Sequence, residues 1–176
     1  AAAAHRPGLT QVLGGTGTSM RLKPFLPTIV ACALVSVLTG QVHTGMFLFF
    51  VVPLVSIWAL ISAYLAWRDP ATRQQRGIRF SIWAVTLVAL FATHAYYRHA
   101  ARLAGQTAAN AIAAYRLANG SYPPSLQAAG IPPDPRWRVG YVLAKDGPFL
   151  FYPSTFVPFD IYSYNFERGA WEYRPD

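Results

Sequence analysis

The sequence predicts a membrane protein of mixed class, with three transmembrane helices followed by a small α+β outer domain. Three observations support this fold class. The 176 residues are 53% hydrophobic and only 12% charged, about half the charged fraction of a typical soluble domain. Two long stretches, residues 24–67 and 80–97, contain no Asp, Glu, Lys or Arg. Short aromatic segments with the alternation of β-strands follow them.

The first uncharged stretch is too long for one straight helix across a bilayer and suits two helices joined by a turn. The polar residues 40–45 mark that turn. We therefore expect helices at residues 24–39 and 46–67, and a third at 80–97. A cleaved signal sequence at residues 20–39 is an alternative. Its loss would remove the partner of the next span and invert the charge asymmetry of the loops.

The chain divides into three parts. Residues 1–19 are small and rich in Gly and Thr, and we interpret them as a leader or upstream extension. Residues 20–78 are expected to form a two-span hairpin with a basic loop. Residues 79–176 are expected to form a membrane helix that continues into the outer domain.

The charges predict the orientation of the spans. The chain has a net charge of +8, and its basic residues gather before the first span and between the second and third. The residues concerned are Arg21, Lys23, Arg68, Arg73, Arg76 and Arg79. Since positive loops stay in the cytoplasm, the N-terminus is expected inside and the C-terminal domain outside. These positions favour a bilayer as partner and exclude nucleic acid, because no basic stripe forms.

The outer domain is expected to begin as a helix that runs unbroken past Arg98 and stops at Asn119-Gly120. An apolar stripe along this helix is expected to face a sheet. The stripe consists of Leu103, Thr107, Ala111, Ala114 and Leu117, with Ile112 and Tyr115 beside them. Predicted strands are residues 137–144, 148–153, 161–164 and 170–174. Residues 145–147 and 167–169 read as hairpin turns.

The end of this helix carries a recognisable pattern. Ala111-Ile112-Ala113-Ala114-Tyr115 precedes Asn119-Gly120-Ser121-Tyr122-Pro123-Pro124-Ser125-Leu126. The C-terminal part, about residues 79–176, thereby resembles the type II secretion major pseudopilins and related type IV pilin-like proteins. The resemblance implies a long membrane helix packed on a three- to four-stranded antiparallel sheet. It also implies a bacterial inner membrane, with the outer domain in the periplasm.

The sequence departs from that family at the processing site. A pilin leader is cut after a Gly, with Glu five residues further on. Here the fifth residue after Gly77 is Ile82, and two further spans precede the helix. We therefore expect neither processing nor assembly into a filament. The acidic residues of the tail lack the spacing of calcium ligands, so the calcium site of some family members is not expected.

The sequence contains no catalytic constellation, so we expect no enzyme, no cofactor and no metal site. His43 and His94 are the polar residues of interest within the apolar region. A hydrogen bond to another helix is the expected role of His94, since an unpaired polar ring in a span is costly. Haem or quinone binding by the two histidines is the alternative.

The tail holds more aromatic residues than a small sheet can bury. An exposed aromatic patch that binds a protein is therefore expected. Its candidate members are Phe156, Phe159, Tyr162, Tyr164, Trp171 and Tyr173, and the loop at residues 153–160 is expected to contribute most.

Three functions fit these expectations. The first is a non-catalytic accessory or assembly factor of a secretion or pilus-type system, which binds protein through its periplasmic domain. The second is an immunity protein that neutralises a toxin acting in the periplasm or membrane. The third is a small structural or electron-transfer subunit of a larger membrane complex.

Overall fold

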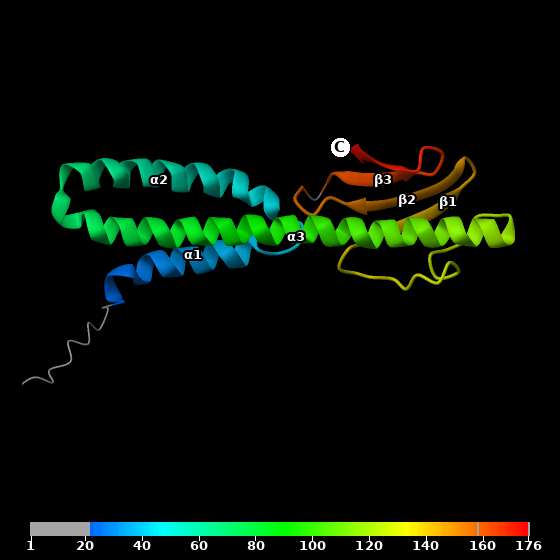
Figure 1. Ribbon diagram of the computed structural model, residues 1–176, viewed down its shortest axis with the longest axis horizontal. Helices are drawn as coiled ribbons and strands as arrows, with labels where there is room; N and C mark the ends of the chain where they lie inside the picture. Colours follow the sequence, from blue (N-terminus) through cyan, green and yellow to red (C-terminus); the bar gives the residue numbers. More distant parts are fainter. Residues whose placement is uncertain (1–21, 158, 176) are drawn as a thin grey trace, which may run out of the picture.

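The computed structural model describes residues 22–157 and 159–175. The leader predicted at residues 1–19 lies outside the described residues. Figure 1 shows an elongated molecule with one long helix as its spine, two helices along one half and a sheet along the other. The helices are α1 (Leu26–Thr39), α2 (Leu48–Arg68) and α3 (Arg73–Asn119).

The spine, α3, is a continuous helix of 47 residues, which corresponds to about 70 Å. The prediction that the helix passes Arg98 without a break is confirmed. Its predicted end is also confirmed, because Gly120 follows with a left-handed φ of 71°. Glycine takes this conformation without a steric penalty, which makes it the common residue after a helix end.

Two of the three predicted transmembrane helices have the length and composition to cross a bilayer. These are the helical segments Gly45–Arg68 and Pro70–Asn119. The remaining apolar segment, Lys23–Thr39, is shorter. Prolines at its start delay α1, whose 14 residues extend about 21 Å against a hydrocarbon core of roughly 30 Å. The prediction of three transmembrane helices is therefore wrong for the first.

The basic loop between α2 and α3 is shorter than expected. α3 begins at Arg73 and not near residue 79. The connection contains the 3-10 turn Pro70–Thr72, which Asp69 caps by accepting a hydrogen bond from the Ala71 backbone N–H at 3.1 Å. Most of the predicted loop arginines therefore lie on the first turns of α3, where they project from a rigid element.

The sheet is an antiparallel meander in which each strand pairs with the next. Its strands are β1 (Gly140–Ala144), β2 (Gly147–Pro153), β3 (Ile161–Asn165) and β4 (Ala170–Arg174). Both predicted hairpin turns are present. β1 starts later than residue 137 because Arg138 has a positive φ of 49°, which ends any extended run. Trp137 is instead buried beside α3.

The core lies between α3 and one face of the sheet. Small side chains of α3 face this core, together with Ile112; the buried set is Ala101, Gly105, Ala108, Ala109 and Ile112. The sheet contributes Leu150 and Tyr152. A Cβ at Gly105 would come within 2.9 Å of Trp171 and Tyr152, so the helix and sheet approach closely.

The predicted apolar stripe of the helix is mostly not the buried one. Leu103 is 55% exposed and Leu117 is 89% exposed, whereas Ile112 alone of the predicted set is fully buried. The face of α3 that meets the sheet is defined by small residues. Close approach of a helix backbone to large aromatic side chains requires such residues, because a larger side chain would leave no room.

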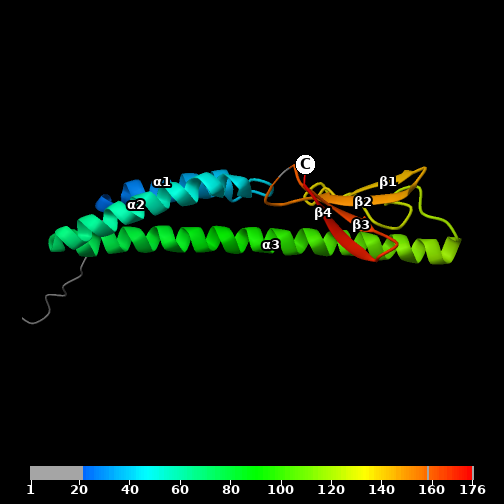
Figure 2. The same cartoon turned by 90° about the horizontal axis from the view of Figure 1, so that it is seen from above.

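Residues 121–139 return along α3 on the side that also carries the sheet (Figure 2), and their apolar side chains pack against the core. The Tyr141 hydroxyl donates to the Pro123 carbonyl at 2.9 Å. Ser125 accepts a hydrogen bond from the Ala128 backbone N–H at 3.2 Å and thereby caps the short turn that follows. Tyr122 lies beneath the guanidinium of Arg116, which donates to its hydroxyl at 2.6 Å.

Candidate functional site

The turn between α1 and α2 is hydrogen-bonded to the loop between β2 and β3. The His43 backbone N–H donates to the Thr155 carbonyl at 3.0 Å, and the Met46 N–H donates to the Phe156 carbonyl at 2.9 Å. The Nδ1–H of His43 donates to the Ser154 carbonyl at 2.9 Å. These bonds connect segments more than 100 residues apart and join the two halves of the molecule at one place.

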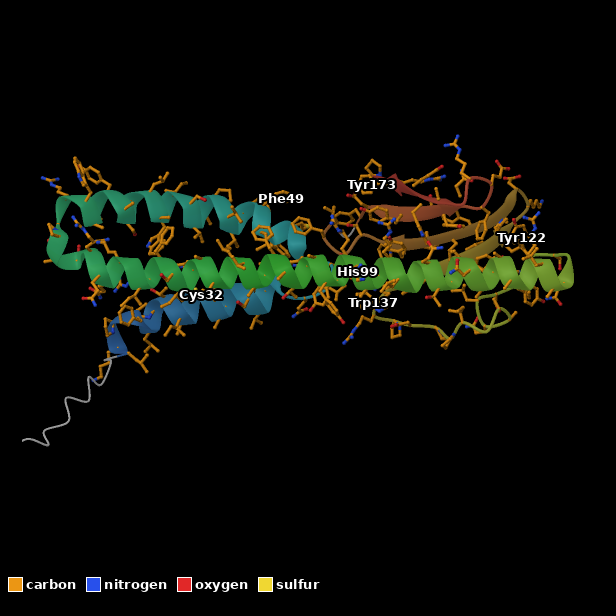
Figure 3. The ribbon with its side chains drawn as sticks, in the orientation of Figure 1. Cys32, Phe49, His99, Tyr122, Trp137 and Tyr173 are labelled. Carbon is orange, nitrogen blue, oxygen red and sulfur yellow. The ribbon has the colours of Figure 1, made fainter. Side chains whose placement is uncertain are left out.

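Phe156 fills the centre of this junction. Its ring lies against Gly45 and meets Phe49 edge-on, with ring centroids 5.5 Å apart. It also lies edge-on to His94, again at 5.5 Å. Figure 3 shows Phe49 at the end of α2 that faces the sheet. Phe156, which was predicted to belong to an exposed patch, is thus half-buried and occupied by contacts within the chain.

His94 and Tyr97 of α3 cap the end of α1. The Nε2–H of His94 donates to the Thr39 carbonyl at 2.7 Å, and the Tyr97 hydroxyl donates to the Gly40 carbonyl at 3.1 Å. The last carbonyls of a helix have no partner within it, so side chains of another helix satisfy them here. This arrangement confirms the expected hydrogen bond from His94 to a neighbouring helix.

The two histidines contact the same loop, His43 through Ser154 and His94 through Phe156. In each ring the second nitrogen, Nε2 of His43 and Nδ1 of His94, is buried without a hydrogen-bond partner. Across residues 22–157 and 159–175, no group of three or more His, Cys, Asp or Glu side chains is placed to hold a metal ion.

The strand members of the predicted aromatic patch share the face of the sheet that is turned toward α3, because they pair directly with one another or with Leu150 and Tyr152 across the strands. Tyr162, Tyr164 and Trp171 point toward α3, where Trp171 donates from Nε1 to Gln106 Oε1 at 3.0 Å. Tyr173 is 52% exposed at the edge, and its hydroxyl donates to Asp160. Phe159 is 65% exposed. Phe159 and Tyr173 are thus the predicted members that remain available to a partner.

The outward face of the sheet carries apolar residues that the sequence reasoning missed. Phe149 and Phe151 alternate with the core residues Leu150 and Tyr152 and therefore point away from α3. Their ring centroids are 5.3 Å apart. Val142 pairs with Phe149 on the neighbouring strand and is 54% exposed. The alternation within β2 was the available signal, but it does not say which set faces the helix.

The two edges of the sheet differ in charge. The β4 edge carries Glu172 and Arg174, and Glu172 pairs with Arg168 and Arg174 at 3.4 and 3.9 Å. The β1 edge has the sequence GYVLA and carries no charge. Outside the sheet, no backbone hydrogen bond from the described residues reaches β1. β1 therefore offers an unprotected row of backbone donors and acceptors.

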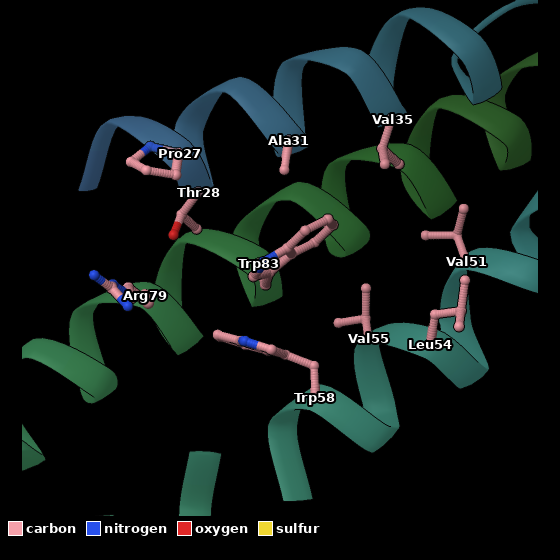
Figure 4. A pocket seen from close by; sticks show the side chains of 10 residues that line it. All are labelled: Pro27, Thr28, Ala31, Val35, Val51, Leu54, Val55, Trp58, Arg79 and Trp83. Atoms are coloured by element: carbon pink, nitrogen blue, oxygen red, sulfur yellow. The ribbon is translucent and has the colours of Figure 1, made fainter. Parts of the chain in front are cut away.

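A separate cleft lies in the apolar half of the molecule. It has a volume of about 460 Å³ and opens between α1, α2 and α3 (Figure 4). Trp58 and Trp83 face each other across it, with ring centroids 6.5 Å apart. Arg79 lies at one end and donates from Nη2 to the Pro24 carbonyl at 2.9 Å. Among the described residues that line the cleft, Arg79 is the one with a titratable side chain.

No family model, curated protein or solved structure matches the chain. The geometry of the junction, of the β1 edge and of the outward sheet face therefore carries the functional argument.

Proposed function

We propose that this chain is a non-catalytic membrane protein whose outer domain binds another protein, as an accessory or assembly factor of a secretion or pilus-type system. The observation that carries the proposal is the uncharged free edge of β1 beside the outward rings of Phe149 and Phe151. An open edge of this kind binds an extended segment of a partner as an added strand.

The chemistry of the edge indicates what the partner segment is. Val142 is 54% exposed and Leu143 is 45% exposed, and β1 contains neither Lys nor Pro, the residues that usually block strand addition. A partner strand with alternating apolar side chains would continue the surface formed by Val142 and Phe149. Affinity would come from the backbone ladder and selectivity from these side chains.

The arrangement of helix and sheet supports the pilin-like part of the proposal. An apolar helix continues without a break into the helix on which the antiparallel sheet packs, which is the arrangement that the resemblance implies. α3 ends before Gly120, and Tyr122-Pro123-Pro124 after it belong to the pattern on which the resemblance rests. The proposal places the chain in a bacterial inner membrane, with its N-terminus in the cytoplasm and the sheet in the periplasm.

Cysteine labelling tests this orientation. In a Cys32→Ser background, we expect Lys145→Cys, in an exposed hairpin turn, to react with a membrane-impermeant maleimide in spheroplasts. Gln74→Cys, exposed near the start of α3, is expected to react only after lysis, because the positive residues around it favour the cytoplasm. Equal labelling of both positions in sealed spheroplasts would contradict the proposed topology.

A charge placed on the free edge tests the binding mode. We expect Val142→Lys to reduce recovery of the partner in detergent pull-downs at least about tenfold, because an edge lysine opposes strand addition. Ala170→Lys introduces the same charge on the opposite edge strand, where the residue is also exposed, and is expected to leave recovery unchanged.

The captured protein decides between the functional classes. A pilus or secretion component whose recovery depends on Val142 supports the proposal. A single toxin recovered in that way would replace it with the immunity function. Equal recovery with both lysine variants would exclude binding at the β1 edge.

A further inference from the structure

A second cavity lies between α3 and the sheet, close to the junction of the two halves. It has a volume of about 350 Å³ and is lined by Arg98, Arg102, Tyr152, Tyr162 and Trp171. Neither its residues nor its position belongs to the β1 edge. Its lining combines two cations with three aromatic side chains.

Among the described residues, neither arginine has a carboxylate partner. They lie one helical turn apart on the same face of α3, where like charges repel each other. Within the described parts of the chain, the ion pairs are those of Glu172 with Arg168 and Arg174, and none involves Arg98 or Arg102. A bound anion would remove the repulsion and satisfy guanidinium donors that face the cavity.

The aromatic side of the cavity adds rigid walls and hydroxyl donors. Tyr152 and Tyr162 stack with centroids 5.2 Å apart and an interplanar angle of 18°. Trp171 meets Tyr152 edge-on at 4.8 Å, and its own N–H is already used by Gln106. No hydrogen bond from the two tyrosine hydroxyls to another described residue is found, so both can donate to a ligand.

The Tyr152 hydroxyl keeps its proton over the physiological range. Burial raises the pKa of Tyr152 to about 12, and the neighbouring Tyr162 adds to the rise, while Arg102 and Arg98 oppose it. The opposing effect of both arginines reflects their proximity to this hydroxyl. The cavity therefore presents two guanidinium groups and two protonated hydroxyls that can donate hydrogen bonds, which favours an anion with several acceptor oxygens.

We propose that this cavity binds a phosphate group. Two guanidiniums one turn apart, with two hydroxyl donors opposite, match the several acceptor oxygens of a phosphate and its preference for arginine. Arg98 directly follows Tyr97, where the uncharged part of α3 ends. In the membrane orientation proposed above, this is the level of the lipid head groups, where Trp and Tyr also concentrate. A lipid phosphate and a free phosphate share the chemistry that the cavity recognises.

The test uses the full chain in a nonionic detergent without phosphate, with tryptophan fluorescence as the readout. Trp171 lines the cavity, and Trp171→Phe identifies its share of the signal among the five tryptophans. The probes are sodium phosphate, short-chain phosphatidylglycerol, and a galactosyl diacylglycerol that lacks phosphate, all at constant ionic strength. We expect the two phosphate probes, or the lipid alone, to change the Trp171 signal and the galactolipid to leave it unchanged.

Variants of the arginines separate the cavity from general charge effects. Arg98→Gln and Arg102→Gln are each expected to weaken binding roughly tenfold, and the double variant roughly a hundredfold, since each removes charge-assisted hydrogen bonds. Arg138→Gln removes the same charge from an exposed residue outside the cavity and is expected to bind normally. Arg98→Lys keeps the charge but loses the planar fork, so an intermediate affinity is expected.

The outcomes are distinct. A response to phosphatidylglycerol alone identifies a lipid head group, and a response to sodium phosphate identifies a soluble phosphate. Equal responses to the phosphate lipid and the galactolipid, or an unchanged affinity in the double variant, would overturn the site. The expectation that phosphatidylglycerol binds rests on the membrane anchoring proposed above. Loss of phosphate binding would not change the recovery of the protein partner at the β1 edge. Either proposal can therefore fail without the other.

Discussion

Replacing Leu150 with alanine is expected to lower the free energy of unfolding of the outer domain by about 2–5 kcal/mol. Leu150 is fully buried at the centre of the sheet. It pairs with Tyr141 on one side and Tyr164 on the other and packs on Ala108, Ala109 and Ile112 of α3.

The loss of unfolding free energy is expected to be large because the neighbouring residues cannot move into the space that the Leu150 side chain leaves. The α3 residues that face Leu150 are mostly alanines, which have no rotamers to adjust, and their backbone belongs to a long continuous helix. A cavity therefore persists and adds to the lost burial of the side chain. Denaturant unfolding in detergent, followed by the fluorescence of the buried tryptophans, measures the change.

Val142→Ala is the matched control for this measurement. Val142 lies on the adjacent strand but points outward and is 54% exposed, so its truncation should change the stability by no more than about 0.5 kcal/mol. A loss at Leu150 as small as that at Val142 would contradict the core described between α3 and the sheet.

The second large effect is expected from His99→Pro. His99 lies on α3 between the apolar half and the sheet half (Figure 3), with its side chain exposed. Proline removes the hydrogen bond from the residue 99 N–H to the Ala95 carbonyl and its ring collides with that carbonyl. A cost of about 3 kcal/mol or more and a kink at this position follow.

A kink at His99 would separate the two halves at their junction. The His43 and Met46 N–H groups donate to the loop after β2, and a kink in α3 would move that loop away from them. We therefore expect these two amides to exchange hydrogen for deuterium faster in His99→Pro than in the unchanged protein. His99→Ala removes the same side chain and keeps the helix, so its exchange should remain slow. Equal protection in both variants would show that the junction does not depend on a straight α3.

The sequence was sufficient where local chemistry decides the structure. Gly120 supplies the left-handed residue that ends α3, and the hairpin turns are set by short polar segments with glycine. The strands followed from aromatic alternation. The long helix was predictable because residues 98–117 contain no proline and much alanine.

The sequence was insufficient where packing decides the structure. The predicted stripe of α3 relied on large apolar side chains such as Leu103 and Leu117, yet the sheet packs on Ala101, Ala108 and Gly105. Alternation within β2 does not say whether Phe149 and Phe151 or Leu150 and Tyr152 face the helix. That choice is made by the aromatic residues of β3 and β4, which share the core with the second pair.

The candidate site was limited by the same problem at longer range. The aromatic residues at 153–160 suggested an exposed surface, but Phe156 found its partners in the turn between α1 and α2. Contacts between residues so far apart in the chain leave no local pattern. The role of His94 was predictable because an apolar environment leaves a polar ring few alternatives to a hydrogen bond.

The bonds between the α1–α2 turn and the loop after β2 have a consequence for how a partner approaches. They restrict rotation of the sheet about α3. The strands run roughly lengthwise along that helix (Figure 1). If α3 spans the bilayer, the free edge of β1 is held in a fixed orientation relative to the membrane. A partner anchored in the same membrane would approach this edge in a restricted range of orientations. It would therefore lose less rotational entropy on binding than a partner arriving from solution.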